Sequence, residues 1–271
     1  YSQDRFTITK CTNCGLLFTN PRPTEATIGK YYDNPEYVSH TDTQDGLLFK
    51  IYRSVTRFSL KQKRGLLTEL TEGRTVLDYG AGSGDFSNEL SSNGWNVHAY
   101  EPDEKARTLI IQQNTTIKIV SELNEIENNT IDVITLWHVL EHVHKLKETL
   151  KHFQRILKPS GKLIIAVPNH TSFDAEFYRE EWAAYDVPRH LYHFNPETIS
   201  PLLARLGFNF QSMKPLWFDS VYVSLLSEKN KNQSNIIGWL RASFVGFISN
   251  ITTVFNKKRC SSLTYIFEKP I

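Results

Sequence analysis

The sequence is poor in cysteine, in methionine and in net charge. Three cysteines and one methionine occur among 271 residues, and the formal net charge is +2. Three cysteines are too few for the disulfide framework of a small extracellular protein. We therefore expect a reducing, cytoplasmic location. The near-neutral charge gives no reason to expect nucleic acid as a partner.

Long hydrophobic runs are also missing. No window comes near the roughly 18 consecutive apolar residues of a membrane span, and no signal peptide is recognisable. The chain begins with Tyr1, and its only methionine is Met213, so we expect further residues upstream in the full protein. Hydrophobic residues make up 40% of the chain and charged residues 22%, as in a globular protein with a substantial core.

Residues 1–43 carry a pattern that is similar to a zinc knuckle. Residues 5–20 are predicted to form two short strands around the turn CTNCG, and a helical cap is expected to begin at Thr24. A structural zinc ion needs four ligands, whereas Cys11 and Cys14 supply two. Zinc binding is therefore expected only if a second CxxC exists upstream.

Residues 44–271 are predicted to form an α/β domain. VLDYG, NVHAYE, IKIV, IDVITLW and KLIIAVPN are short β-rich runs, and helical segments such as LKETLKHFQRIL separate them. This alternation predicts a mostly parallel sheet that helices cover. Ligands of such sheets bind at the carboxyl ends of the strands.

Two segments interrupt this alternation. Residues 170–195 follow the fifth strand and are expected on the acceptor side of the site. Residues 229–257 form a helical insertion, in which apolar residues recur every three or four positions and predict an amphipathic helix from Asn235 to Phe255. Its apolar face could pack on its own domain or on a dimer partner, or residues 235–259 could make peripheral membrane contact. Either a monomer or a homodimer is expected.

A glycine-rich turn follows the first predicted strand of the α/β domain. In VLDYGAGSGDF, Gly80, Gly82 and Gly84 permit a tight turn and the close approach of a ligand. The next strand ends at Tyr100 and Glu101, and a carboxylate at that position can accept hydrogen bonds from both hydroxyls of a ribose. The two features together predict a cofactor that contains adenosine.

Four segments, in this order, resemble the motif series of class I S-adenosylmethionine-dependent methyltransferases: VLDYGAGSGDF, HAYEPDEKA, IDVITLWHVLEHV and LKPSGKLIIAVPN. The variant HVLEH is typical of the UbiG-like branch, and CTNCGLLFTNPRP and DVPRHLYHF resemble one bacterial subgroup. The resemblance implies a doubly wound, Rossmann-like sheet of seven strands, with the last strand antiparallel and helices on both faces. It also implies S-adenosylmethionine as cofactor, S-adenosylhomocysteine as product, and a small molecule, glycan or lipid precursor that is methylated on oxygen, nitrogen or carbon.

The same resemblance assigns residues to the cofactor. The glycines are expected at its methionine and ribose portions, Glu101 at the ribose, and residues 121–123 at the adenine. The full set of expected cofactor contacts is Asp78, Gly80, Ala81, Gly82, Gly84, Tyr100, Glu101, Pro102, Ser121, Glu122, Leu123, Trp137 and His138.

Three histidines are candidate general bases for a hydroxyl acceptor, because histidine exchanges protons near neutral pH. His138 lies just past the fourth strand, and His190 and His193 lie in PRHLYHF after the fifth. Each has a structural alternative: His138 as a wall of the cofactor pocket, the other two as hydrogen-bonding groups of the fold.

Three other interpretations remain open. His138, Glu141 and His142 could hold a divalent metal, as some UbiG-like enzymes are associated with one there, although the leading interpretation assigns no metal. An NAD-dependent oxidoreductase is disfavoured, because Asp85 occupies a position where the dinucleotide fingerprint needs a small residue. The third is a methyltransferase-like domain that binds without catalysing.

Overall fold

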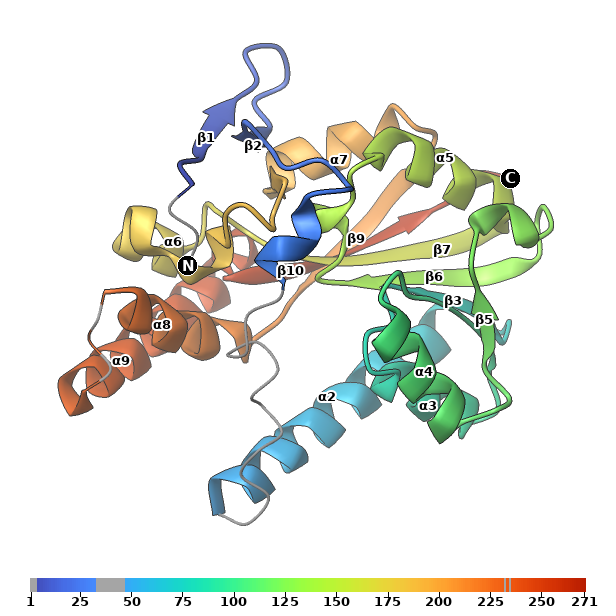
Figure 1. Cartoon of the computed structure of the whole chain (residues 1–271), viewed down its shortest axis with the longest axis horizontal. Coiled ribbons are helices and arrows are strands. Elements are labelled where there is room, and N and C mark those ends of the chain that lie inside the picture. Colours follow the sequence, from blue (N-terminus) through green and yellow to red (C-terminus); the bar gives the residue numbers. More distant parts are fainter. Residues whose placement is uncertain (1–3, 33–46, 232, 234) are drawn as a thin grey trace. The chain divides into compact units, whose positions relative to one another are not determined.

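The computed structural model describes residues 4–32, 47–231, 233 and 235–271 (Figure 1). The chain divides into two compact units. Unit 1 comprises Tyr1–Ile28, Trp137–Leu146 and Ile165–Phe267, and unit 2 comprises Gly29–Leu136, Lys147–Ile164 and Glu268–Ile271. The domain boundary near residue 43 stays a prediction.

A seven-stranded sheet confirms the predicted α/β fold. Its strand order is β5-β4-β3-β6-β7-β10-β9. The strands are β3 (Thr75–Tyr79), β4 (Asn96–Tyr100), β5 (Lys118–Val120), β6 (Ile131–Trp137), β7 (Leu157–Pro168), β9 (Asn209–Pro215) and β10 (Ser262–Glu268). β3, β4, β5 and β6 pair in parallel, with Asp78 opposite both Ala99 and Thr135.

The last strand runs antiparallel to its neighbour, as the family resemblance implied. Near one end of the β7–β10 pair, the amide of Asn169 donates to the carbonyl of Ser261, and at the other end the amide of Ser160 donates to the carbonyl of Lys269. Residue numbers therefore rise along β7 as they fall along β10, which defines an antiparallel pair.

Unit 2 builds the first half of this sheet. Its helices are α2 (Leu47–Leu70), α3 (Asp85–Ser91), α4 (Glu104–Gln113) and most of α5 (Leu146–Ile156). α3 packs on β4 and α2 packs on α3. The strands bury aliphatic side chains, among them Val76, Leu77, Val133 and Ile134. Their near-continuous apolar sequences fit strands that are covered on both faces.

In unit 1, the predicted N-terminal hairpin is present. β1 (Thr7–Lys10) and β2 (Leu17–Asn20) pair antiparallel, and β2 also pairs with β8 (Tyr192–His193), which the sequence did not predict. The expected helix after Thr24 is only a short 3-10 helix, η1 (Ile28–Tyr31). The Thr27 hydroxyl accepts from the Thr24 amide, and such local bonds compete with a regular helix. Residues 33–43 of the expected cap lie outside the described residues.

The remaining helices of unit 1 are α6 (Phe173–Tyr178), α7 (Pro196–Ala204), α8 (Asp219–Asn230) and α9 (Ile236–Phe255). α9 confirms the predicted helix, and its N-cap Asn235 accepts from the amide of Gly238. α8 and α9 form a hairpin, lying side by side along their lengths (Figure 1). Within the part of the chain that was searched, no helix has the length and apolar content to cross a bilayer.

A buried carboxylate connects three segments of unit 1. Asp174, on α6, accepts hydrogen bonds from Trp182 Nε1 at 2.7 Å, from Ser249 Oγ of α9 at 2.8 Å and from Ser261 Oγ at 2.7 Å. The side chain of Asp174 is fully buried. These donors satisfy a charge that would otherwise be costly to remove from water.

Replacing Asp174 should destabilise the fold. Asp174→Ala leaves three donors unpaired, and each buried unpaired group costs about 1–3 kcal/mol. We expect denaturant unfolding to show a loss of about 3–5 kcal/mol, and a smaller loss for Asp174→Asn, which keeps an acceptor oxygen. The control is Ser83→Ala, which removes an exposed hydroxyl that bonds only locally to Asp85. Equal unfolding midpoints for Asp174→Ala and the control would contradict this role.

Candidate functional site

The glycine-rich loop between β3 and α3 turns against the end of β4. The amides of Gly80 and Ala81 both donate to the carbonyl of Tyr100, at 2.8 and 3.1 Å. Gly80, Gly82 and Gly84 have φ angles of 79°, 56° and 83°, a left-handed region that disfavours residues with a Cβ.

Two of these glycines differ in what surrounds them. A Cβ at Gly84 would lie 2.7 Å from Cγ1 of Ile110, so packing also requires glycine there. Around a Cβ at Gly82, by contrast, no atom of the residues that the structure describes lies within 4 Å. The backbone at Gly82 therefore has open space into which a ligand can approach.

Glu101, which follows β4, fixes this loop by accepting hydrogen bonds from backbone amides. Its Oε2 accepts from the amide of Gly82 at 2.8 Å, and its Oε1 accepts from the amide of Asp103 at 3.0 Å. A carboxylate offers about four lone-pair sites, so these two bonds leave capacity for two hydroxyl donors. The side chain is only partly buried. The structure thus brings together the loop and the acid that the sequence paired.

Asp78 lies beneath the loop. Its carboxylate accepts from Ser87 Oγ of α3 at 2.8 Å and from Thr135 Oγ1 of β6 at 2.9 Å. Burial raises the pKa of this carboxyl, and the two hydroxyl donors act in the opposite direction. Asp78 therefore ties three elements together and orients the loop, while its contact with a cofactor stays a prediction.

The other expected cofactor residues of unit 2 have a well-fixed backbone. Arg155 donates to the carbonyls of Leu123 and Ile126, both at 2.8 Å, and the amide of Glu122 donates to Glu125 at 2.8 Å. Arg107 donates to the carbonyls of Glu101 and Pro102. Tyr100 stacks on Tyr79 with ring centroids 4.5 Å apart. The adenine contacts assigned to residues 121–123 stay a prediction.

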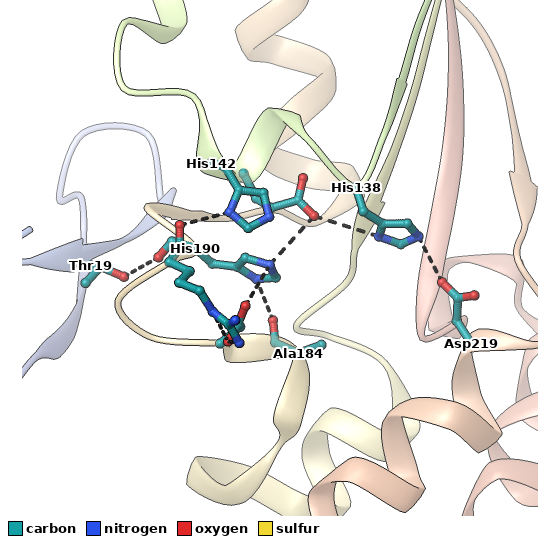
Figure 2. A network of polar contacts seen from close by, with 9 residues as sticks. Thr19, His138, His142, Ala184, His190 and Asp219 are labelled. Carbon is teal, nitrogen blue, oxygen red and sulfur yellow. Dashed lines mark hydrogen bonds and ion pairs between the residues drawn. The ribbon is translucent and has the colours of Figure 1, made fainter. Parts of the chain in front are cut away.

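A cluster of histidines and carboxylates, which we call the histidine cluster, lies wholly within unit 1. It begins where β6 ends. His138 has a φ of 57°, which is uncommon for a residue with a side chain, and its amide donates to the carbonyl of Ala166 at 2.9 Å. Its Nε2 lies 3.2 Å from Oδ2 of Asp219, and its Nδ1 lies 3.8 Å from Oε1 of Glu141 (Figure 2). The imidazole is thus placed between two carboxylates.

The two carboxylates decide the charge of His138. Burial lowers the pKa of the imidazole, but Asp219 and Glu141 outweigh burial and raise the pKa to about 10. His138 is therefore an imidazolium at neutral pH, and it must lose this proton before it can accept another. Sequence reasoning missed Asp219, because it begins helix α8, for which no apolar periodicity was found.

Glu141, on the short helix η4 (Leu140–His142), is almost completely buried. Its side chain is 1% exposed, and within the described ranges neither carboxylate oxygen has a hydrogen-bond partner. The imidazoles of His138 and His190 approach Oε1 at 3.8 and 4.0 Å. A buried carboxylate without a donor is costly, so a positive charge or a bound cation is expected beside it.

His142 and His190 lie beside Glu141, and Nε2 of His190 faces its carboxylate. Nδ1 of His142 lies 3.1 Å from the carbonyl of Arg189, and Nδ1 of His190 lies 2.9 Å from the carbonyl of Ala184. Because a carbonyl only accepts, each Nδ1 carries the hydrogen, and each neutral ring keeps a lone pair on Nε2. Burial lowers the pKa of His190 well below its usual value, and neighbouring histidines lower it further, so this ring is neutral.

Glu141, His142 and His190 could hold a divalent metal ion. Their ligand atoms all lie within 4.8 Å of one another. Two imidazole nitrogens and one carboxylate oxygen suit zinc or other divalent transition metals, and the two backbone carbonyls keep both rings oriented (Figure 2). The sequence had grouped His138 with Glu141 and His142. The structure instead adds His190 to this pair, and His138 reaches toward Asp219 on its other side.

His193 lies in a different environment. Thr19 Oγ1 donates its only hydrogen to the carbonyl of His190 at 2.6 Å, so His193 Nε2, at 3.1 Å, must donate to Thr19. Burial, with a smaller effect from His170, lowers the pKa of His193 to about 3. His193 thus joins β8 to β2 as a neutral donor, and its assignment as a base stays a prediction.

Comparisons with known proteins identify relatives and structural neighbours. A family profile described as a methyltransferase domain matches residues 50–212. The sequence is similar to the ubiquinone biosynthesis O-methyltransferase of Rickettsia bellii strain OSU 85-389, with 21% identity over 229 residues that cover 79% of this chain and 95% of that protein.

Two solved structures have a similar fold. Phosphoethanolamine N-methyltransferase 2 of Haemonchus contortus, in complex with S-adenosyl-L-methionine, has a TM-score of 0.55 and 18% identity over 78% of this chain and 53% of that chain. This chain thus spans about half the length of the Haemonchus enzyme. A SAM-dependent methyltransferase of Archaeoglobus fulgidus has a TM-score of 0.51 and 19% identity over 79% of this chain and 94% of that chain. At these identities the likeness shows the fold alone.

The arrangement of Glu141, His142 and His190 predicts metal binding. After chelator treatment, calorimetric titration with Zn²⁺ or Mn²⁺ should show one ion per chain. His190→Ala should weaken binding at least tenfold, because a ligand is lost, and Glu141→Gln should do the same. The matched control is His144→Ala, which removes a nearby histidine that bonds to the carbonyl of Pro23. Unchanged affinity in His190→Ala would exclude this ligand set.

Proposed function

This chain belongs to the class I S-adenosylmethionine-dependent methyltransferases, and we propose that it methylates a hydroxyl group of a small-molecule acceptor. The observation that carries the proposal is the bond between the Gly82 amide and Glu101, which joins an open glycine loop to a carboxylate that can still accept. The family assignment sets aside an oxidoreductase. We also propose a cytoplasmic location.

The residues of unit 2 fit this cofactor. Open space at Gly82 admits a ligand against the backbone, and Glu101 retains lone pairs for the two ribose hydroxyls. The proposed contacts are those that the family resemblance named: Asp78, Gly80, Ala81, Gly82, Gly84, Tyr100, Glu101, Pro102, Ser121, Glu122, Leu123, Trp137 and His138. When bound, the cofactor supplies a methyl group on a positively charged sulfur. The sulfur is a good leaving group, because it departs as a neutral thioether.

His138 is the proposed general base. Asp219 lies against Nε2, and in the neutral ring it holds the hydrogen on that nitrogen. Because His138 is an imidazolium at neutral pH, Nδ1 must first release its proton to solvent. In the neutral ring Nδ1 then takes the proton of an acceptor hydroxyl, and Asp219 stabilises the imidazolium that forms. Asp219 is thus a positioning residue. His190 and His193 are second candidates, because His190 is a proposed metal ligand and Nε2 of His193 donates to Thr19.

The relatives' names support a small acceptor without identifying it. The Rickettsia protein is named for O-methylation in ubiquinone biosynthesis, and the Haemonchus enzyme for N-methylation of phosphoethanolamine. A base beside the acceptor favours oxygen, since a hydroxyl must lose a proton as the new bond forms. We propose a glycan or a lipid precursor as the acceptor class.

Cofactor binding tests the first part of the proposal. Calorimetry with S-adenosylmethionine or S-adenosylhomocysteine should show one site per chain. Glu101→Ala should weaken binding at least tenfold, because the ribose hydroxyls lose their acceptor and the loop loses its bond to Glu101. Glu104→Ala, a few residues further on in α4, is the matched control and should bind normally. The proposal fails if the intact protein binds neither compound.

Methyl transfer tests the second part. A screen of cell extracts with radiolabelled S-adenosylmethionine should yield a labelled product that identifies the acceptor. His138→Ala should lower kcat by about 10²–10⁴-fold, the usual contribution of a general base. Asp219→Asn should also lower kcat, and His152→Ala on α5 should not. Full activity in His138→Ala would remove His138 from the chemistry.

A further inference from the structure

Helix α9 is amphipathic in the reverse sense from most surface helices. It buries small residues and exposes large apolar ones. The buried residues are Gly238, Ala242, Val245, Gly246, Ser249 and Thr253. The exposed residues, which we call the apolar face of α9, are Ile236, Ile237, Trp239, Leu240, Phe244, Phe247, Ile251, Val254 and Phe255, each 37 to 86% exposed.

Packing within the hairpin explains the small residues. A Cβ at Gly246 would lie 2.7 Å from Cα of Val221 on α8, so the two helix backbones are in close contact. Ser249 faces inward to reach Asp174. The inward face is therefore specified by contact with the protein, whereas the large apolar residues of the outward face stay exposed among the residues that the structure describes. Contiguous apolar surface of this extent marks a binding surface.

The charges around the apolar face are positive. α9 contains no acidic residue, and its only charged residue, Arg241, is neutralised by Glu228 on α8 at 2.7 Å. Basic residues stand at both ends of the helix: Lys229 and Lys231 precede it, and Lys257, Lys258 and Arg259 follow it. Lys258 and Arg259 pair with Glu197 and Glu176 on other helices, and the ammonium group of Lys231 lies over the rings of Phe177 and Tyr178.

We propose that the α8–α9 hairpin binds the surface of an anionic lipid membrane. The apolar face of α9 would enter the boundary between headgroups and acyl chains, where interfacial helices bury about 5–10 Å deep, and the flanking lysines would contact anionic headgroups. Trp217, Phe218 and Tyr222, where α8 begins, are also exposed and supply aromatic groups suited to that boundary.

A second copy of this chain fits the same face less well. If two α9 helices packed in antiparallel directions, the lysines after one helix would meet those before the other, and in a parallel pair the same ends would meet. Lys258 and Arg259 are already paired with carboxylates. Either arrangement nevertheless brings Lys231 and Lys257, or two copies of one of them, close together, and α9 has no acidic residue to offset them. Lipid phosphates supply the missing negative charge.

This surface bears on the acceptor, if the proposed function holds. Asp219, which lies beside His138, is the first residue of α8 and so belongs to the same hairpin. Docking of the hairpin would hold the His138–Asp219 pair of unit 1 at the membrane. The acceptor class would then be an amphiphilic lipid precursor carried in that membrane rather than a freely dissolved molecule.

Vesicle flotation of the full chain tests the inference independently of methyl transfer. The protein should float with phosphatidylcholine vesicles that contain phosphatidylglycerol, more weakly with phosphatidylcholine alone, and less at high salt. The triple variant Leu240→Ser, Phe244→Ser, Phe247→Ser should bind at least tenfold less, with unchanged affinity for S-adenosylhomocysteine. The matched control is Leu109→Ser with Ile111→Ser, which removes two exposed apolar residues of α4 and should bind normally.

Two further measurements complete the test. Lys231→Gln and Lys257→Gln should each weaken binding to anionic vesicles about fivefold, as expected for the loss of one positive charge near the surface. Brominated lipids should quench the wild-type tryptophan fluorescence, and Trp239→Phe should remove much of that quenching. This conservative substitution tests the contact without disrupting the helix. Equal binding of the triple variant and the wild type would overturn the inference. An absence of vesicle binding by the wild type would also overturn it. If the wild type were then found to be a dimer and the triple variant a monomer, the apolar face of α9 would be assigned to self-association.

Discussion

A buried carboxylate that finds no hydrogen-bond donor among the described residues is the constraint on which the histidine cluster of unit 1 depends. Glu141 is 1% exposed, and its oxygens are approached by imidazoles from two sides. Its own backbone carbonyl accepts from the amide of Leu191, so the segment after β6 and the segment before β8 are held together at the same residue. The cost of burying this carboxylate is reduced by His138⁺, while His190, which burial keeps neutral, offers a lone pair to a cation beside Glu141.

The glycine loop of unit 2 and the histidine cluster of unit 1 are built from different kinds of groups. In unit 2 the loop after β3 presents backbone amides at positive φ angles, and the carboxylate of Glu101 accepts from one of them. In unit 1 the groups are side chains whose protonation is set by their neighbours: two carboxylates keep His138 charged, and burial keeps His190 neutral. Methyl transfer needs both kinds, since the donor must be aligned and the acceptor must lose a proton.

This difference explains how much the sequence could predict. The strands and the glycine loop could be predicted because local rules impose them: alternating strand and helix patterns specify the sheet, and left-handed turns require glycine. The contacts of His138 with Asp219 and of His190 with Glu141 could not be predicted, because each joins segments that are far apart in the chain. α8 has inward-facing serines in place of an apolar stripe, so its helical period was not visible. In α9 the period was visible, but the usual assumption that the apolar side faces inward fails, because close helix contact favours glycine, alanine and serine.

The α8–α9 hairpin is inserted between β9 and β10, the last two strands of the chain. Its first residue, Asp219, provides one of the two counter-charges of His138. A rigid displacement of the hairpin would therefore alter the proton affinity of the imidazole through a single salt bridge. If the hairpin binds a membrane as proposed, that contact would also influence the charge of His138, because Asp219 belongs to the hairpin.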